Sequence, residues 1–204
     1  MKIYLIRHGE SLANLGLVSA DFSMDNQNTL SKKGENQIQT IIPAFQNCNI
    51  VRIFSSPMKR AVKSAEILQS GLVSKPKIII DGRLKEIDYG IYTDDRDNPE
   101  MQNIAKRQIA GDQEIRFGGG ENIREILERF LDFLVTTYKI HQNDGIIILS
   151  HGRLLSIVSK KIEELCQKKI KKSKIVNASI IEVELNNDEI NLLKTYLNTL
   201  KSQF

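Results

Sequence analysis

The chain has little cysteine and no long apolar run, and both absences narrow its class. Its 204 residues include only two cysteines, Cys48 and Cys166, which lie far apart and in no CxxC pair. This excludes a disulfide framework and a cysteine-ligated metal site, and it favours a reducing compartment. No stretch reaches the roughly 18 apolar residues of a membrane span, and the apolar run before Arg7 is too short for a secretory signal. We therefore expect a soluble, cytoplasmic protein that does not act on membranes.

An excess of one charge is also missing. The 29 basic and 25 acidic residues leave a formal net charge of +4, and both signs are spread along the chain. This balance gives no reason to expect a nucleic-acid or membrane partner, although it suits an anionic small molecule. Because domains usually contain about 100–200 residues, and 41% of this chain is hydrophobic, we expect one domain over residues 1–204.

Short apolar runs alternate with amphipathic segments along most of the sequence. Strands are predicted at Ile3–Ile6, Ile50–Ser55, Lys77–Ile80 and Ile146–Leu149. Helical spacing follows Ser31, Pro57, Glu100, Gly120 and His151, with Ser31 expected as an N-cap and Pro57 in a first turn. This alternation predicts an α/β three-layer sandwich, with a mostly parallel central sheet and helices on both faces.

The last part of the chain has a different pattern. Ala178–Leu185 predicts a strand, and Glu189–Tyr196 is expected to form another, joined to it by a turn at Asn186-Asn187. The glycines at 118–120 resemble a phosphate-cradling loop but lack a P-loop lysine, so they are expected to free the backbone before a helix. The lysine-rich segment Lys168–Lys174 is either a patch for an acidic partner or, by preference, a solvated helix end or loop.

Three short motifs follow the ends of predicted strands, where parallel sheets form their sites. They are Arg7-His8-Gly9, Ser55-Ser56-Pro57 and Ser150-His151-Gly152. Histidine can act as a nucleophile near neutral pH because its unperturbed pKa of about 6.5 leaves much of it neutral. Arg7 and Arg60 offer planar forks suited to phosphate oxygens, and a helix beginning near Pro57 would point its positive end at the same region. These residue types predict phosphoryl transfer.

Each of these residues also has an ordinary interpretation. A histidine after a strand is more often structural than catalytic, and Arg60 alone could be a solvated helix residue. However, the chain has only three histidines, and both His8 and His151 follow an apolar strand and precede a glycine. The third, His141, lies in a polar stretch and is expected to be exposed to solvent.

The motifs, taken in order, resemble those of the histidine phosphatase superfamily, which includes the cofactor-dependent phosphoglycerate mutases. The matching segments are Arg7-His8-Gly9-Glu10-Ser11 with Asn14, Leu30-Ser31 with Gly34 and Gln37, Ser55-Ser56-Pro57 with Arg60-Ala61 and Ser64-Ala65-Glu66, Leu84-Lys85-Glu86 with Gly90, Gly119-Gly120-Glu121 with Arg129, and Ser150-His151-Gly152 with Asn177. They cover nearly the whole chain up to its final predicted strands.

The resemblance implies a phosphohistidine mechanism with no metal and no cofactor. It implies that His8 is phosphorylated and then hydrolysed, and that the phosphoryl group is held by Arg7, Arg60 and His151, with help from Asn14 and, more weakly, Ser11. Glu86 matches the family's proton donor, and Asp88 is close enough in sequence to be a rival acid. Because surrounding cations favour an ionised carboxylate, we expect proton donation only in the substrate complex.

Departures from the family pattern concern the substrate. The mutases carry an arginine and a histidine after the catalytic glutamate, where this chain has Ile87 and Asp88. We therefore expect a phosphatase acting on a small phosphorylated metabolite, with a cap that sets specificity around residues 92–117. A phosphoglycerate mutase and a catalytically silent phospho-ligand-binding protein remain the alternatives. The oligomeric state stays open, with a homodimer as one option.

Overall fold

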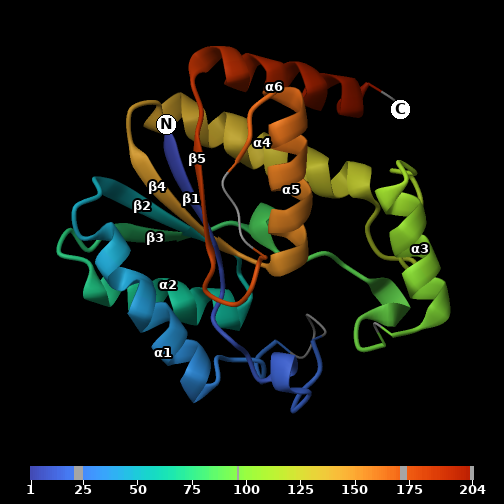
Figure 1. Cartoon of the computed structure of the whole chain (residues 1–204), viewed down its shortest axis with the longest axis horizontal. Helices are drawn as coiled ribbons and strands as arrows, with labels where there is room; N and C mark the ends of the chain where they lie inside the picture. The colour runs from blue at the N-terminus through green and yellow to red at the C-terminus, as the bar shows by residue number, and fades with distance from the viewer. Residues whose placement is uncertain (21–24, 96, 171–173, 203–204) are drawn as a thin grey trace.

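The central feature of the computed structural model is a five-stranded sheet (Figure 1). The structure describes residues 1–20, 25–95, 97–170 and 174–202. The strands are β1 (Lys2–Arg7), β2 (Ile50–Ser55), β3 (Lys77–Ile80), β4 (Gly145–Ser150) and β5 (Ile180–Glu184), in the order β3-β2-β4-β1-β5. All neighbours run parallel except β1 and β5, which are antiparallel. The predicted mostly parallel sheet is confirmed.

Helices cover both faces of this sheet. The α-helices of the described residues are α1 (Lys32–Ile41), α2 (Lys59–Gly71), α3 (Pro99–Ile109), α4 (Ile123–His141), α5 (Gly152–Leu165) and α6 (Asn187–Lys201), and α3 lies to the side of the sheet (Figure 1). Tyr4 and Ile6 of β1 pack in one apolar cluster with α1 and α2, whereas Ile3 and Leu5 pack in a second cluster with α4, α5 and α6. This alternation along one strand confirms the three-layer α/β sandwich. No helix in the described ranges is both long and apolar enough to cross a membrane.

The prediction of a strand at Glu189–Tyr196 is wrong, because this segment lies inside α6. Asn186 caps that helix: its side chain accepts a hydrogen bond from the Glu189 amide at 2.9 Å, and the Glu189 carboxylate accepts one from the Asn186 amide at 2.9 Å. Such a reciprocal capping box begins a helix rather than a hairpin turn. One face of α6 is buried, through Ile190, Leu193, Leu197 and Leu200.

Two smaller expectations also need correction. Pro57 precedes the helix instead of occupying its first turn, because Met58 is the N-cap of α2. His141 is not exposed to solvent: as the last residue of α4 it is only 8% exposed, and its ring centroid lies 5.9 Å from that of Phe54. Its Nδ1 lies 2.8 Å from a carboxylate oxygen of Asp144, which satisfies the buried ring.

Other local expectations are confirmed. Ser31 caps α1 and accepts a hydrogen bond from the Gly34 amide at 3.0 Å. Gly118 and Gly119 have φ angles of +43° and +85°, which glycine adopts without strain before α4. The described part of the lysine-rich segment, Lys168–Ile170 and Lys174, belongs to the connection after α5, whereas Lys171 and Lys172 lie outside the described residues.

Candidate active site

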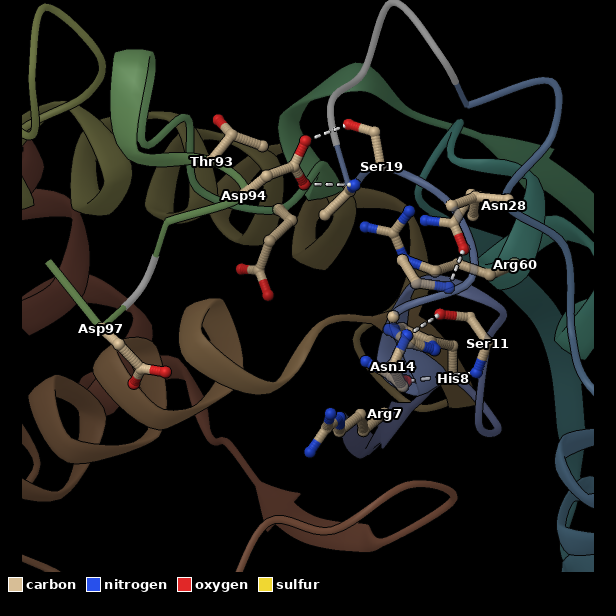
Figure 2. Close-up of a pocket in the computed structure, with 15 residues that line it drawn as sticks. Arg7, His8, Ser11, Asn14, Ser19, Asn28, Arg60, Thr93, Asp94 and Asp97 are labelled. Carbon is tan, nitrogen blue, oxygen red and sulfur yellow. Dashed lines mark hydrogen bonds between the residues drawn. The ribbon is translucent and has the colours of Figure 1, made fainter.

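A polar cavity of about 550 Å³ opens where the parallel strands end (Figure 2). Six of the seven residues that the sequence predicted for the site line it: Arg7, His8, Ser11, Asn14, Arg60 and Glu86. The seventh, His151, is fully buried next to His8, with 5.1 Å between the ring centroids. The fold therefore brings together residues that are distributed over most of the sequence.

Strand register places the two histidines side by side. β1 and β4 pair in parallel with Arg7 opposite Ser150, so the next residue of each strand, His8 and His151, emerges at the same edge of the sheet. The His8 amide donates a hydrogen bond to the Ser150 carbonyl at 3.0 Å, which extends the ladder by one residue. Their approach follows directly from the pairing of the two most buried strands.

The tautomer of His8 follows from its partner. Its Nδ1 lies 2.6 Å from the Gly9 carbonyl oxygen, and a carbonyl can only accept. Nδ1 must therefore carry the proton in the neutral ring, which leaves the lone pair on Nε2. The His8 carbonyl is held by the Asn177 side chain and the Ala178 amide, each at 3.2 Å. In its neutral form, His8 is therefore held with the proton on Nδ1 and the lone pair on Nε2.

The loop after His8 depends on two interlocking glycines. A Cβ on Gly9 would lie 2.3 Å from the Gly34 carbonyl oxygen, and a Cβ on Gly34 would lie 2.0 Å from the Glu10 carbonyl oxygen. The first turn of α1 consequently packs directly on the backbone of this loop. The Gly9 amide also donates to the Ser64 hydroxyl of α2 at 3.2 Å. The resemblance picked out both glycines, but only the structure gives their reason.

Two arginines supply the positive charge of the cavity. Arg7 ends β1 and donates to the Ile175 carbonyl at 2.9 Å. Arg60, in the first turn of α2, is only 4% exposed and lies 3.1 Å from a carboxylate oxygen of Asp25. Burial raises the pKa of Asp25, while the Lys59 amide and the Arg60 guanidinium oppose this rise. Arg60 is therefore a positioned cation rather than a solvated helix residue.

His151 is neutral in this environment. Burial, followed by the charges of Arg60 and then other cationic groups around the site, lowers its pKa well below the usual range. Its Nε2 lies 2.8 Å from the Ser56 hydroxyl, which also accepts a hydrogen bond from the Met58 amide at 3.3 Å. Within the described part of the chain, the buried His151 Nδ1 has no hydrogen-bonding partner. Ser56 thus orients the ring beside His8.

Asn14 and Ser11 form a small hydrogen-bonded turn at the cavity wall. The Asn14 Oδ1 accepts hydrogen bonds from the Ser11 amide and the Asn177 side chain, both at 3.1 Å. The Ser11 hydroxyl accepts from the Asn14 amide at 3.3 Å. Because the side-chain Oδ1 of Asn14 faces these two donors, the side-chain Nδ2 points away from them. Ser11 is fully buried and shapes the turn.

The structure separates the two candidate acids. Glu86 lines the cavity, and its Oε1 accepts hydrogen bonds from the Ile87 amide at 3.0 Å and the Leu154 amide at 3.2 Å. Leu154 lies in the first turn of α5, so the carboxylate sits at the positive end of that helix. Asp88 is exposed, caps the Gly90 amide at 2.8 Å, and does not belong to the described cavity wall.

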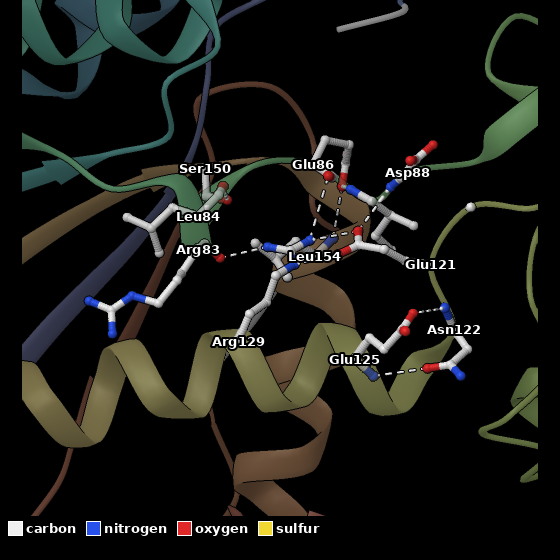
Figure 3. A network of polar contacts seen from close by, with 12 residues as sticks. Arg83, Leu84, Glu86, Asp88, Glu121, Asn122, Glu125, Arg129, Ser150 and Leu154 are labelled. Carbon is white, nitrogen blue, oxygen red and sulfur yellow. Dashed lines mark hydrogen bonds and ion pairs between the residues drawn. The ribbon is translucent and has the colours of Figure 1, made fainter. Parts of the chain in front are cut away.

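An ion pair beneath Glu86 holds its backbone (Figure 3). The Arg129 guanidinium of α4 pairs with the Glu121 carboxylate at 2.8 and 3.1 Å and donates to the Arg83 carbonyl at 2.6 Å. It also lies 3.5 Å from the Glu86 carbonyl, and Glu121 accepts from the Asp88 amide at 3.0 Å. One side of the Glu86 segment is therefore tied to α4 through Arg129, and the other to Glu121, just before that helix.

Sequence reasoning missed several residues of the wall. The further described residues that line the cavity are Ala13, Gly16, Val18, Ser19, Ala20, Asn28, Thr93, Asp94 and Asp97. Asp94 accepts hydrogen bonds from the Ser19 hydroxyl and from the Ala20 amide at 2.7 Å, which joins two distant loops. The expected specificity segment hinted at residues 93–97, but no sequence signal marked Asn28. Ser56 stood inside a predicted motif without an assigned role.

Comparisons with known proteins agree with this geometry. A protein of Erwinia tasmaniensis named probable phosphoglycerate mutase GpmB is 25% identical over 187 residues, which cover 90% of this chain and 85% of that protein. A mycobacterial glucosyl-3-phosphoglycerate phosphatase structure with VO3 has a TM-score of 0.73 at 19% identity and covers 93% of each chain. Phosphoserine phosphatase of Entamoeba histolytica, in complex with 3-phosphoglyceric acid, has a TM-score of 0.68 at 22% identity and covers 89% of each chain.

The two structural likenesses, at these identities, establish the fold alone, and the names include both phosphatases and a mutase. The family itself is established separately, by a family model that matches residues 3–198. With His8, two arginines and a glutamate gathered at one cavity and His151 buried behind His8, the chain belongs to the histidine phosphatase superfamily (branch 1), whose members act on phosphorylated small molecules.

Proposed function

We propose that this protein is a metal-independent phosphatase that hydrolyses a small phosphomonoester through a phosphohistidine on His8. The main support is the 2.6 Å contact between His8 Nδ1 and the Gly9 carbonyl, which leaves the Nε2 lone pair as the nucleophile. Nε2 attacks phosphorus, the P–O ester bond breaks, and Glu86 gives its proton to the leaving oxygen. Water then attacks phospho-His8 and loses a proton to the Glu86 carboxylate, which releases phosphate and restores both groups.

The charges of the wall support the binding of a phosphoryl group. Arg7 and Arg60 supply fixed guanidinium groups, and neutral His151 and Asn14 supply polar groups beside His8. Electrostatic stabilisation of this kind is the main requirement of phosphoryl transfer. The Ile87 and Leu154 amides hold Glu86 Oε1 in the cavity wall. These contacts position the carboxyl to protonate the leaving oxygen of a bound substrate.

The other end of the cavity favours a phosphatase over a phosphoglycerate mutase. Among the described lining residues, the side chains of the 93–97 segment that face the cavity are Thr93, Asp94 and Asp97, and two of these are carboxylates. A substrate carboxylate placed there would be repelled, whereas hydroxyl or ammonium groups would be accepted. We propose that residues 92–117 form a cap of a single domain and that the substrate's non-phosphate part is uncharged or cationic. The name of the Erwinia tasmaniensis relative is the observation that keeps the mutase as a second candidate.

Hydrolysis of p-nitrophenyl phosphate in the presence of a chelator tests this proposal. Wild type should turn over and His8→Ala should not, while His141→Gln, which changes a buried histidine outside the cavity, should retain activity. Rapid quenching should trap an acid-labile phosphoryl group on wild type only. Activity that disappears with the chelator would contradict the mechanism. Faster interconversion of phosphoglycerates than their hydrolysis would favour the mutase, and binding of vanadate without turnover of any phosphomonoester would favour the silent binder.

A further inference from the structure

Asn28 has a buried hydrogen-bond donor in the cavity wall that the proposed mechanism does not use. Its side chain is fully buried, and the residue lines the same cavity as His8 and Arg60 (Figure 2). Its Oδ1 accepts a hydrogen bond from the Ala13 amide at 3.1 Å. Because that amide can only donate, the orientation of the Asn28 carboxamide is fixed. Its Nδ2 has no hydrogen-bonding partner within the described parts of the chain.

Asn28 is hydrogen-bonded on one side to the turn that carries Asn14 and on the other to Asp25, the partner of Arg60. The Ala13 amide that it binds belongs to the turn that carries Asn14. On its other side, the Asn28 amide donates to the Asp25 carbonyl at 3.1 Å, and the Asp25 carboxylate pairs with Arg60. Asn28 therefore lies between two of the residues proposed to bind the phosphoryl group.

The unpaired N–H group of Asn28 favours a ligand that carries hydrogen-bond acceptors. A buried N–H group without an acceptor is unfavourable, so the site gains from a ligand that brings oxygen acceptors. The non-bridging oxygens of a phosphate dianion only accept hydrogen bonds, and hydrogen bonds to charged groups are the stronger ones. We propose that Asn28 Nδ2 donates a hydrogen bond to a non-bridging oxygen of the bound phosphoryl group. This inference rests on the proposed function and adds a substrate-binding residue to it.

Asn28→Asp removes the donor and keeps the local acceptor, because the new carboxylate still accepts from the Ala13 amide but carries a negative charge in place of the N–H group. We expect the inhibition constants of vanadate and inorganic phosphate to rise by about ten- to a hundredfold, as the loss of a hydrogen bond to a charged group implies. Asn26→Asp is the matched control, since it adds the same charge at an exposed position of the same loop. Its inhibition constants should stay within about twofold of wild type, as is usual for an exposed charge.

Three outcomes are distinguishable. An Asn28→Asp variant with the wild-type melting temperature and wild-type vanadate inhibition would overturn the inference while leaving the proposed function intact. A wild-type chain that neither turns over p-nitrophenyl phosphate nor binds vanadate would instead contradict the proposed function itself. If Asn28→Asp does not fold, the wild-type chain gives the answer: the Asn28 side-chain amide signals in a ¹⁵N–¹H spectrum should shift on addition of phosphate, and unchanged signals at saturation would overturn the inference.

Discussion

Replacing Arg129 by methionine should destabilise the fold and loosen Glu86 at the same time. The side chains of Arg129 and Glu121 are only 13% and 14% exposed. Removing one partner of a buried ion pair costs about 3–5 kcal/mol, because the other charge stays buried without compensation. Since both side chains retain some contact with solvent, we expect the lower end, about 3 kcal/mol. For a chain of this size, that corresponds to a melting temperature about 6–12 °C lower.

The assay compares melting temperatures of Arg129→Met, Glu121→Gln and the double variant by calorimetry. If the penalty comes from the unpaired charge, the double variant should be more stable than the sum of the single losses predicts. Arg83→Met is the control, since Arg83 is 34% exposed and its ion pairs should contribute about 1 kcal/mol or less. A loss below about 1 kcal/mol for Arg129→Met, or strict additivity in the double variant, would refute the reasoning.

The remaining predictions concern local geometry, pH and proton transfer. Gly34→Ala should lower the free energy of unfolding by more than about 3 kcal/mol and abolish activity, because its Cβ would clash with the Glu10 backbone. Gly82→Ala is the control and should leave the melting temperature and the rate unchanged, since a Cβ there meets nothing within 4 Å. Equal effects of the two substitutions would contradict the clash. The lowered pKa of His151 means that the unfolded chain binds more protons below pH of about 6.5, so the free energy of unfolding should fall as the pH drops from there. His151→Asn should flatten that slope by up to about 1.4 kcal/mol per pH unit in denaturant titrations, and an unchanged slope would show that His151 is not the group responsible. Glu86→Gln should slow the hydrolysis of alkyl phosphates far more than that of p-nitrophenyl phosphate, because the aryl leaving group needs less protonation. Asp88→Asn should change neither rate. The reverse pattern would make Asp88 the acid.

Most of the sheet could be predicted because its strands are short, continuous apolar runs. Ile146–Leu149 reads as a buried strand in the sequence and is fully buried in β4. The error at Glu189–Tyr196 arose where two signals competed, since Asn186-Asn187 is typical of a turn but also begins a capping box with Glu189. The apolar positions 190, 193, 197 and 200 follow helical spacing. Giving more weight to this period would have identified the helix.

Site residues could be predicted where they directly follow a strand, but not where contacts between loops place them. His8 and His151 follow β1 and β4, so their meeting follows from strand order. Asn28 was missed because only the contact with Ala13, from another loop, fixes the orientation of its side-chain amide. The burial of His141 was missed for the same reason, since Phe54 of β2 covers a ring that the local sequence makes look solvated. Only the fold separates Glu86, which lines the cavity, from Asp88, which is exposed to solvent.

The parallel pairing of β1 with β4 has a consequence for the synthesis of the protein. β1 carries Arg7 and leads into His8, but its partner strand begins only at Gly145, after α1 to α4. During translation, β1 is made early, but the strands that it pairs with, β4 and β5, leave the ribosome much later. Even the amide hydrogen bond that extends the ladder at His8 needs Ser150. A growing chain therefore carries His8 apart from His151, and the two rings come together only when β4 pairs with β1.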